Sequence, residues 1–237
     1  MAPDKNMKTT HPFPTLLILL LAGLLTITPG CDSGGGGGPS VPDADTPDAD
    51  ADDGGEEESV VSETPDCLAV GDGLTKGVGV DYGKSWPQLL EDRLDAPVAV
   101  DARGGASVAD VAGRLQELLE FDPASHVLVL VGTNDIAEQN PIDEMRASYQ
   151  SIINIARANG ATPILATLPA LYGYGNEAVA HLLDINAMIR SVAGANGVRV
   201  ARLDVEFGTD QTLILDDGVH PSPTGHVIIM AAFYDLL

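Results

Sequence analysis

The chain has 237 residues, of which 44% are hydrophobic and only 4% aromatic, so it can bury one good core that Leu, Val, Ala and Ile must fill. Its formal net charge is −23, and the stretch from Asp32 to Asp66 holds twelve acidic residues and no Lys or Arg. This balance argues against a nucleic-acid partner, because the chain offers no basic stripe for phosphates.

The first segment, residues 1–31, is predicted to be a targeting signal. A positively charged start precedes the apolar run 16–25, which is too short for a stable membrane span. Pro29-Gly30-Cys31 follows and resembles a bacterial lipoprotein processing site, in which the cysteine is lipidated and becomes the mature N-terminus. Cys31 is therefore the expected lipid anchor to a membrane of the bacterial cell envelope, with the domain facing the periplasm or the exterior. Ordinary signal-peptidase cleavage is the alternative.

Residues 32–65 are predicted to be a disordered, acidic linker. Five consecutive glycines, several prolines and alternating Asp-Ala pairs cannot bury apolar surface, and the acidic side chains repel one another. The run 48–52 has alternating acidic residues, as a calcium loop does. Counting from Asp48 gives Asp53 and Ser59 where an EF-hand needs glycine and glutamate, so that pattern fails. The segment is expected to hold the domain off the membrane.

From residue 66 to residue 237 the sequence alternates short apolar runs with longer segments of helical periodicity. Strands are predicted at 68–70, 97–100, 126–131, 163–167 and 198–203. Helices are predicted at 84–94, 108–121, 143–159, 177–195 and 222–236. This alternation predicts an α/β domain with three layers, α/β/α, around a five-stranded parallel sheet, because right-handed crossovers place helices on both faces.

Four polar segments follow predicted strands or precede the last helix, where open parallel sheets gather their working residues. They are Val70-Gly71-Asp72-Gly73-Leu74-Thr75, Gly104-Gly105-Ala106-Ser107, Gly132-Thr133-Asn134-Asp135 and Asp217-Gly218-Val219-His220-Pro221. Taken singly, each is also what an ordinary tight turn, loop or helix cap would show. Four such segments in this order indicate one site.

Asp217 and His220 are three residues apart, so a turn can bring the carboxylate to one imidazole nitrogen while the other nitrogen faces a cleft. The aspartate would then fix the tautomer and stabilise the imidazolium, as in serine hydrolase triads. An isolated pair of this spacing is also common among surface residues near a helix start. His126, His181 and His226 have no such context and are expected to be structural or exposed. No compact spacing of His, Cys and Asp indicates a metal.

Together the four segments resemble the blocks of the SGNH (GDSL-type) hydrolase family. The resemblance implies an SGNH or flavodoxin-like fold, hydrolysis of carboxylic esters or thioesters of acyl groups or acetylated sugars, and no cofactor. It carries Asp217 and His220 onto the acid and base, and Gly105, Asn134 and the Gly73 N–H onto the oxyanion donors. Gly73 also stands where the first block of the family has its serine nucleophile.

Gly73 has no side chain with which to attack an ester. Loss of a triad nucleophile costs about a million-fold in turnover elsewhere, and Thr75 lies two residues further on, where its hydroxyl should point away. Three hypotheses remain open: a hydrolase in which His220 activates a water directly, a non-catalytic envelope-surface module that binds acyl or acetylated carbohydrate ligands, or a substitution private to this chain.

Two segments are candidate rims of the site. The loop 169–175 carries Tyr172 and Tyr174 beside flexible glycines, and such aromatic side chains would suit an acyl chain or a sugar face. An exposed loop with incidental tyrosines is the alternative. The segment 76–82 is the second candidate.

Overall fold

The structure, a computed structural model, describes residues 67–237; the predicted signal and linker lie outside the described residues. Five parallel strands form one sheet in the order β2-β1-β3-β4-β5. They are β1 (Cys67–Gly71), β2 (Val98–Ala102), β3 (His126–Leu130), β4 (Thr162–Ala166) and β5 (Arg199–Ala201). The predicted α/β fold with a five-stranded parallel sheet is confirmed.

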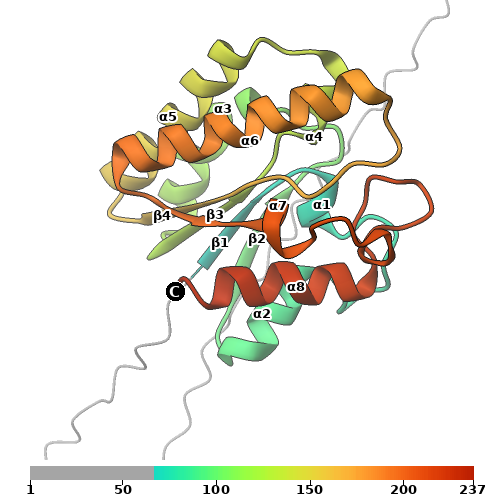
Figure 1. Cartoon of the computed structure of the whole chain (residues 1–237). Helices are drawn as coiled ribbons and strands as arrows, with labels where there is room; N and C mark the ends of the chain where they lie inside the picture. The colour runs from blue at the N-terminus through green and yellow to red at the C-terminus, as the bar shows by residue number, and fades with distance from the viewer. Residues whose placement is uncertain (1–66) are drawn as a thin grey trace, which may run out of the picture. The chain divides into compact units, whose positions relative to one another are not determined.

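Helices cover both faces of this sheet (Figure 1). One layer holds α3 (Val108–Phe121), α5 (Ile142–Ala158) and α6 (Asn176–Asn196), and the other holds α2 (Trp86–Leu94) and α8 (Pro223–Tyr234). The central strand β3 is enclosed by both layers, and the side chains from Val127 to Leu130 are fully buried. A continuous apolar run is what a strand buried on both faces requires. On the α8 side, Trp86 stacks on Phe233 with ring centroids 4.6 Å apart.

The long predicted helices agree with the structure to within two residues at each end, and the short elements account for the differences. The last strand was predicted at 198–203, but β5 ends at Ala201 because Leu203 begins a further helical turn. Sequence reasoning gave no bounds for four short elements: α1 (Gly73–Lys76), α4 (Thr133–Glu138), α7 (Leu203–Glu206) and the 3-10 turn η1 (Gln211–Leu213). Segments this short do not complete enough turns to show a helical period.

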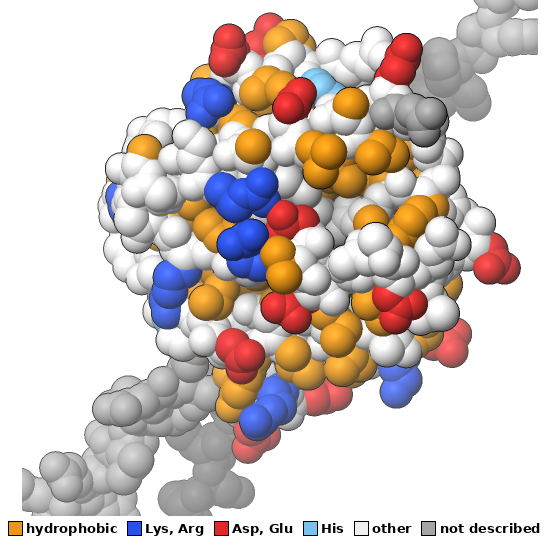
Figure 2. Space-filling model, viewed as in Figure 1, with side chains coloured by type: hydrophobic (Ala, Val, Ile, Leu, Met, Phe, Trp, Pro, Cys, Tyr) orange, Lys and Arg blue, Asp and Glu red, His pale blue; other side chains and the backbone are white. Residues whose placement is uncertain are grey.

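Charged side chains are spread over the surface. On the face in Figure 2, basic side chains lie singly or in small groups among acidic and apolar ones. Arg190 and Arg202 both form ion pairs with Asp204. Within residues 67–237, no helix is long and apolar enough to cross a membrane.

Candidate active site

The turn after β1 brings Gly73 to the carboxyl edge of the sheet. Asp72 caps α1 by accepting the Leu74 N–H at 3.0 Å, and Gly73 is the first residue of this helix. Thr75 is fully buried and its hydroxyl donates to the Leu130 carbonyl at 3.0 Å, which ties the turn to β3. A side chain at Gly71 would overlap that carbonyl, so only glycine fits there. The turn is therefore fixed by contacts on both sides of Gly73.

His220 lies directly against Gly73. A Cβ built on Gly73 would stand 2.7 Å from His220 Nε2 and 3.3 Å from Cδ2. Real Cβ atoms do not approach another heavy atom so closely. The ring thus occupies space that a side chain at residue 73 would need.

Asp217 holds the other side of the imidazole. Its Oδ2 lies 2.7 Å from His220 Nδ1, and its Oδ1 accepts the backbone N–H groups of Val219 at 2.8 Å and His220 at 2.9 Å. Partial burial alone would raise the pKa of Asp217, but these hydrogen bonds outweigh it and hold the pKa below its usual range. The ionised carboxylate orients the ring so that Nε2 faces Gly73.

The loop that carries this pair is packed against the loop after β4. Gly218 O accepts the N–H groups of Tyr172 at 2.7 Å and Gly173 at 2.9 Å. A Cβ on Gly173 would overlap the Asp217 carbonyl, so glycine permits this close approach. The contact places Tyr174 beside the site.

Three candidate oxyanion donors surround the same space. Gly105 lies in the left-handed region at φ +84°, with open space where a Cβ would stand. Among residues 67–237, the N–H groups of Gly73 and Gly105 donate to no partner. The Asn134 amide donates to the Ala106 carbonyl at 3.0 Å and makes a longer contact of 3.5 Å with Asp72 Oδ2. That longer contact is the one a ligand oxygen can most easily replace.

Asp72 is a site residue to which sequence reasoning gave no role. It is fully buried, and burial raises the pKa of its carboxyl to about 6, although N–H groups of Leu74 and Thr133 and the nearby His220 act in the opposite direction. An aspartate followed by glycine after a strand gives no sign of such burial. One of its oxygens, Oδ2, lies 3.5 Å from the amide nitrogen of Asn134.

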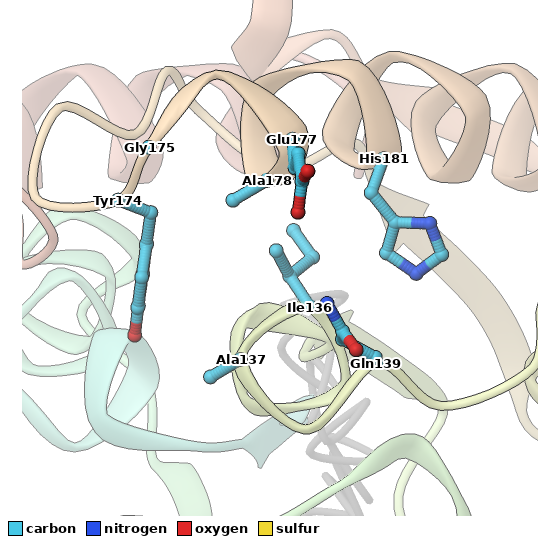
Figure 3. A pocket seen from close by; sticks show the side chains of 8 residues that line it. All are labelled: Ile136, Ala137, Gln139, Tyr174, Gly175, Glu177, Ala178 and His181. Carbon is cyan, nitrogen blue, oxygen red and sulfur yellow. The ribbon is translucent and has the colours of Figure 1, made fainter.

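Two adjoining cavities open at this edge. The smaller, of about 280 Å³, is lined by Gly73, Gly105, Asn134 and His220, among others. The larger, of about 530 Å³, lies between α4 and the start of α6 (Figure 3), and Tyr174 lines both. The structure therefore brings the predicted residues around one space, with Asp217 behind His220. No cluster of His, Cys, Asp or Glu suited to a metal occurs within the described part of the chain.

A parallel α/β/α sheet with an Asp-His pair and convergent N–H donors at its carboxyl edge is typical of hydrolases that act on esters. The comparisons with known proteins define the group more closely. The GDSL-like Lipase/Acylhydrolase family matches residues 69–228, and this chain belongs to that family.

Relatives in two bacteria are named as esterases. An arylesterase of Vibrio mimicus is 26% identical over 162 residues, which is 66% of this chain and 80% of the relative. Esterase TesA of Pseudomonas aeruginosa is 26% identical over 161 residues, which is 65% of this chain and 79% of the relative.

Solved structures show the same fold. The crystal structure of TesA has a TM-score of 0.64 at 22% identity, and the match covers 71% of this chain and 96% of the TesA chain. The acetyl xylan esterase AlAXEase has a TM-score of 0.65 at 18% identity, and the match covers 72% of this chain and 99% of the AlAXEase chain.

Proposed function

We propose that this protein binds a small acyl or acetyl ester in the smaller cavity and hydrolyses it slowly, without a serine nucleophile. In this proposal Gly73 occupies the nucleophile position of the family, and a water takes the place of the missing hydroxyl group. The observation that carries the proposal is the position of His220: Asp217 holds its Nδ1, its Nε2 lies against Gly73, and the residue lines the smaller cavity beside Gly105 and Asn134. That geometry suits a water held by a general base.

The chemistry follows from these positions. A water hydrogen-bonded to His220 Nε2 gives its proton to the ring as its oxygen attacks the ester carbonyl carbon. The tetrahedral oxyanion accepts the N–H groups of Gly73 and Gly105 and the Asn134 amide, which releases Asp72. Asp217 stabilises the imidazolium. When the carbon–oxygen bond breaks, Nε2 returns the proton to the leaving alkoxide, and a carboxylic acid and an alcohol result.

The expected rate is low. Serine hydrolases that lose the nucleophile lose about a million-fold in kcat, and oxyanion donors and binding retain about 10³ to 10⁴ over the uncatalysed reaction. We expect this protein to fall in that residual range, because its donors and its base are in place while the covalent step is not possible.

Hydrolysis of p-nitrophenyl acetate by the wild-type protein, His220→Ala and Gly73→Ala tests the proposal. The alanine at residue 73 places a methyl group against His220 Nε2, which displaces the base, and it adds no nucleophile, so both variants should lose the slow turnover. Turnover that survives His220→Ala would contradict the mechanism.

A non-catalytic binding module is the second candidate. Gly73 itself favours it, as does the engagement of the Asn134 amide with Ala106 and Asp72. Saturable binding of an acyl ester without His220-dependent turnover would support this candidate and refute hydrolysis.

We also propose that the protein is a lipoprotein of the bacterial cell envelope, anchored through Cys31. The sequence Pro29-Gly30-Cys31 after an apolar run supports this. Labelling of the expressed chain with a fatty acid, in comparison with Cys31→Ser, tests it: label that persists in the variant would rule out this anchor.

A further inference from the structure

We propose that the larger cavity binds the alcohol part of the ester, and that it selects an uncharged, polyhydroxylated alcohol, namely a carbohydrate that bears the acyl group. The inference rests on the proposed function, because it assigns the second half of the same substrate. Binding of an unesterified sugar tests the larger cavity separately from ester turnover.

The position of the cavity makes it the natural extension of the active site. Asn134 lies in the first turn of α4, and Ile136 and Ala137 of the same helix line the larger cavity. The opposite wall of this cavity is the first part of α6. In Figure 3, Tyr174 stands at one side and His181 at the other. Because Tyr174 lines both cavities, an ester whose carbonyl lies near His220 can extend past the tyrosine into the larger space. A volume of about 530 Å³ is in the range of small-molecule sites.

Polar groups of this cavity fit hydroxyl groups better than a hydrocarbon chain. Gln139, Glu177 and His181 line it together with small apolar residues of α4 and α6 (Figure 3). A buried acyl chain would strip water from a carboxylate, an amide and an imidazole without replacing their hydrogen bonds, which is unfavourable. Sugar hydroxyls can both donate and accept, and the Tyr174 ring offers a surface for the apolar face of a sugar.

The charge of both cavities selects against anions. Neither cavity is lined by Lys or Arg, and their acidic side chains are Glu177 in the larger and Asp72 in the smaller. An alcohol or thiol that carries phosphate would meet Glu177 with no cation to offset the repulsion. A neutral alcohol meets no such barrier.

One feature of the cavity wall, the imidazole of His181, lacks an explanation within the fold. His181 Nε2 is buried and has no hydrogen-bond partner among the described residues, and a ligand hydroxyl would supply one. Gln139 ends α4 in the left-handed region at φ +57°, where glycine is the usual residue. Asp95 has the same conformation at the end of α2, so what distinguishes Gln139 is that its side chain lines the cavity.

Calorimetric binding to the full chain tests the proposal with three probes: methyl glucoside, its mono-O-acetate and acetyl-coenzyme A. Gln139→Gly removes the amide while relieving the backbone, and Glu177→Gln removes the charge while keeping the shape. Asp95→Gly, at φ +55° on the end of α2, and Glu117→Gln, exposed on α3, are the matched controls.

We expect both sugars to bind, and we expect the two cavity variants to weaken binding about tenfold while the controls bind as the wild type does. Absence of sugar binding, equal effects in variants and controls, or tighter binding of acetyl-coenzyme A than of the sugar acetate would overturn the inference. Sugar binding with this pattern but without ester turnover would support the subsite while refuting the proposed hydrolysis.

Discussion

Replacement of Gly73 by serine is the most direct test of the proposal that Gly73 occupies the nucleophile position. A new Cβ would lie 2.7 Å from His220 Nε2, whereas ordinary contacts begin at 3.4 Å, so the ring must retreat by about 3.4 − 2.7 = 0.7 Å. The ring cannot move straight back, because Asp217 Oδ2 already lies 2.7 Å from Nδ1 and Oδ1 is held by two backbone N–H groups. A rotation of the imidazole or a shift of its loop must supply the space.

The size of the effect follows from this displacement. An intact triad nucleophile is worth about a million-fold in kcat, and a misplacement near 1 Å costs about a hundredfold. We therefore expect Gly73→Ser to raise the kcat for p-nitrophenyl acetate by about 10⁴ rather than 10⁶. The overlap involves the end of one side chain, so the free energy of unfolding should fall by only about 1 kcal/mol.

Gly73→Ala and Gly73→Ser combined with His220→Ala are the controls, measured with the same ester. The alanine displaces His220 equally but adds no nucleophile, so it should give no gain, and the double variant should lose the gain of the serine. A full million-fold increase would refute the claim that the ring occupies the serine's space. No increase at all would show that the site no longer supports acyl transfer.

Three further results are expected. His226 is buried, and burial, with a smaller contribution from His220, lowers its pKa from 6.5 to about 4. The unfolded chain therefore binds this proton first, and stability should fall by about 3 kcal/mol as the pH drops from 6.5 to 4; His226→Asn should flatten that loss in urea titrations at several pH values. Asn134→Ala should lower any His220-dependent turnover by about a hundredfold, measured with p-nitrophenyl acetate. Ser107→Ala, which breaks the capping box of α3, should lower the free energy of unfolding by about 1 kcal/mol in the same titrations, and an unchanged midpoint would contradict that role.

Local signals explain which parts of the fold were predictable. The predicted helix 108–121 has the bounds of α3, because Ser107 and Asp110 form a capping box at its start and an apolar stripe faces the core. Helix α4 was missed because it has only six residues, and residues 132–135 were interpreted only as a polar segment that follows a strand. The long helices have capping and periodicity signals in their own sequence, whereas the short helices form through contacts with the rest of the folded chain.

Some residues of the site could likewise be predicted from the sequence, and others could not. Gly73, Gly105, Asn134 and the Asp-His pair could be chosen because the resemblance to a known family specifies them at separate places in the chain. Gln139 and Glu177 could not, because they come from two helices and become neighbours only when α4 packs beside α6. His181 was expected to be structural or exposed, yet it lines the larger cavity with a buried nitrogen.

The orientation of His220 is not a by-product of folding. Its loop is held by bonds that do not involve the imidazole: Asp217 Oδ1 accepts two backbone N–H groups, and Leu215 N–H donates to the His220 carbonyl at 2.8 Å. A partly exposed contact such as that between His220 and Asp217 contributes only about 0–1 kcal/mol to stability. The loop would therefore keep its shape with another residue at position 220. An imidazole whose Nδ1 is held by Asp217 and whose Nε2 lies against Gly73 at the smaller cavity is instead suited to hold a water or a ligand oxygen that enters this cavity.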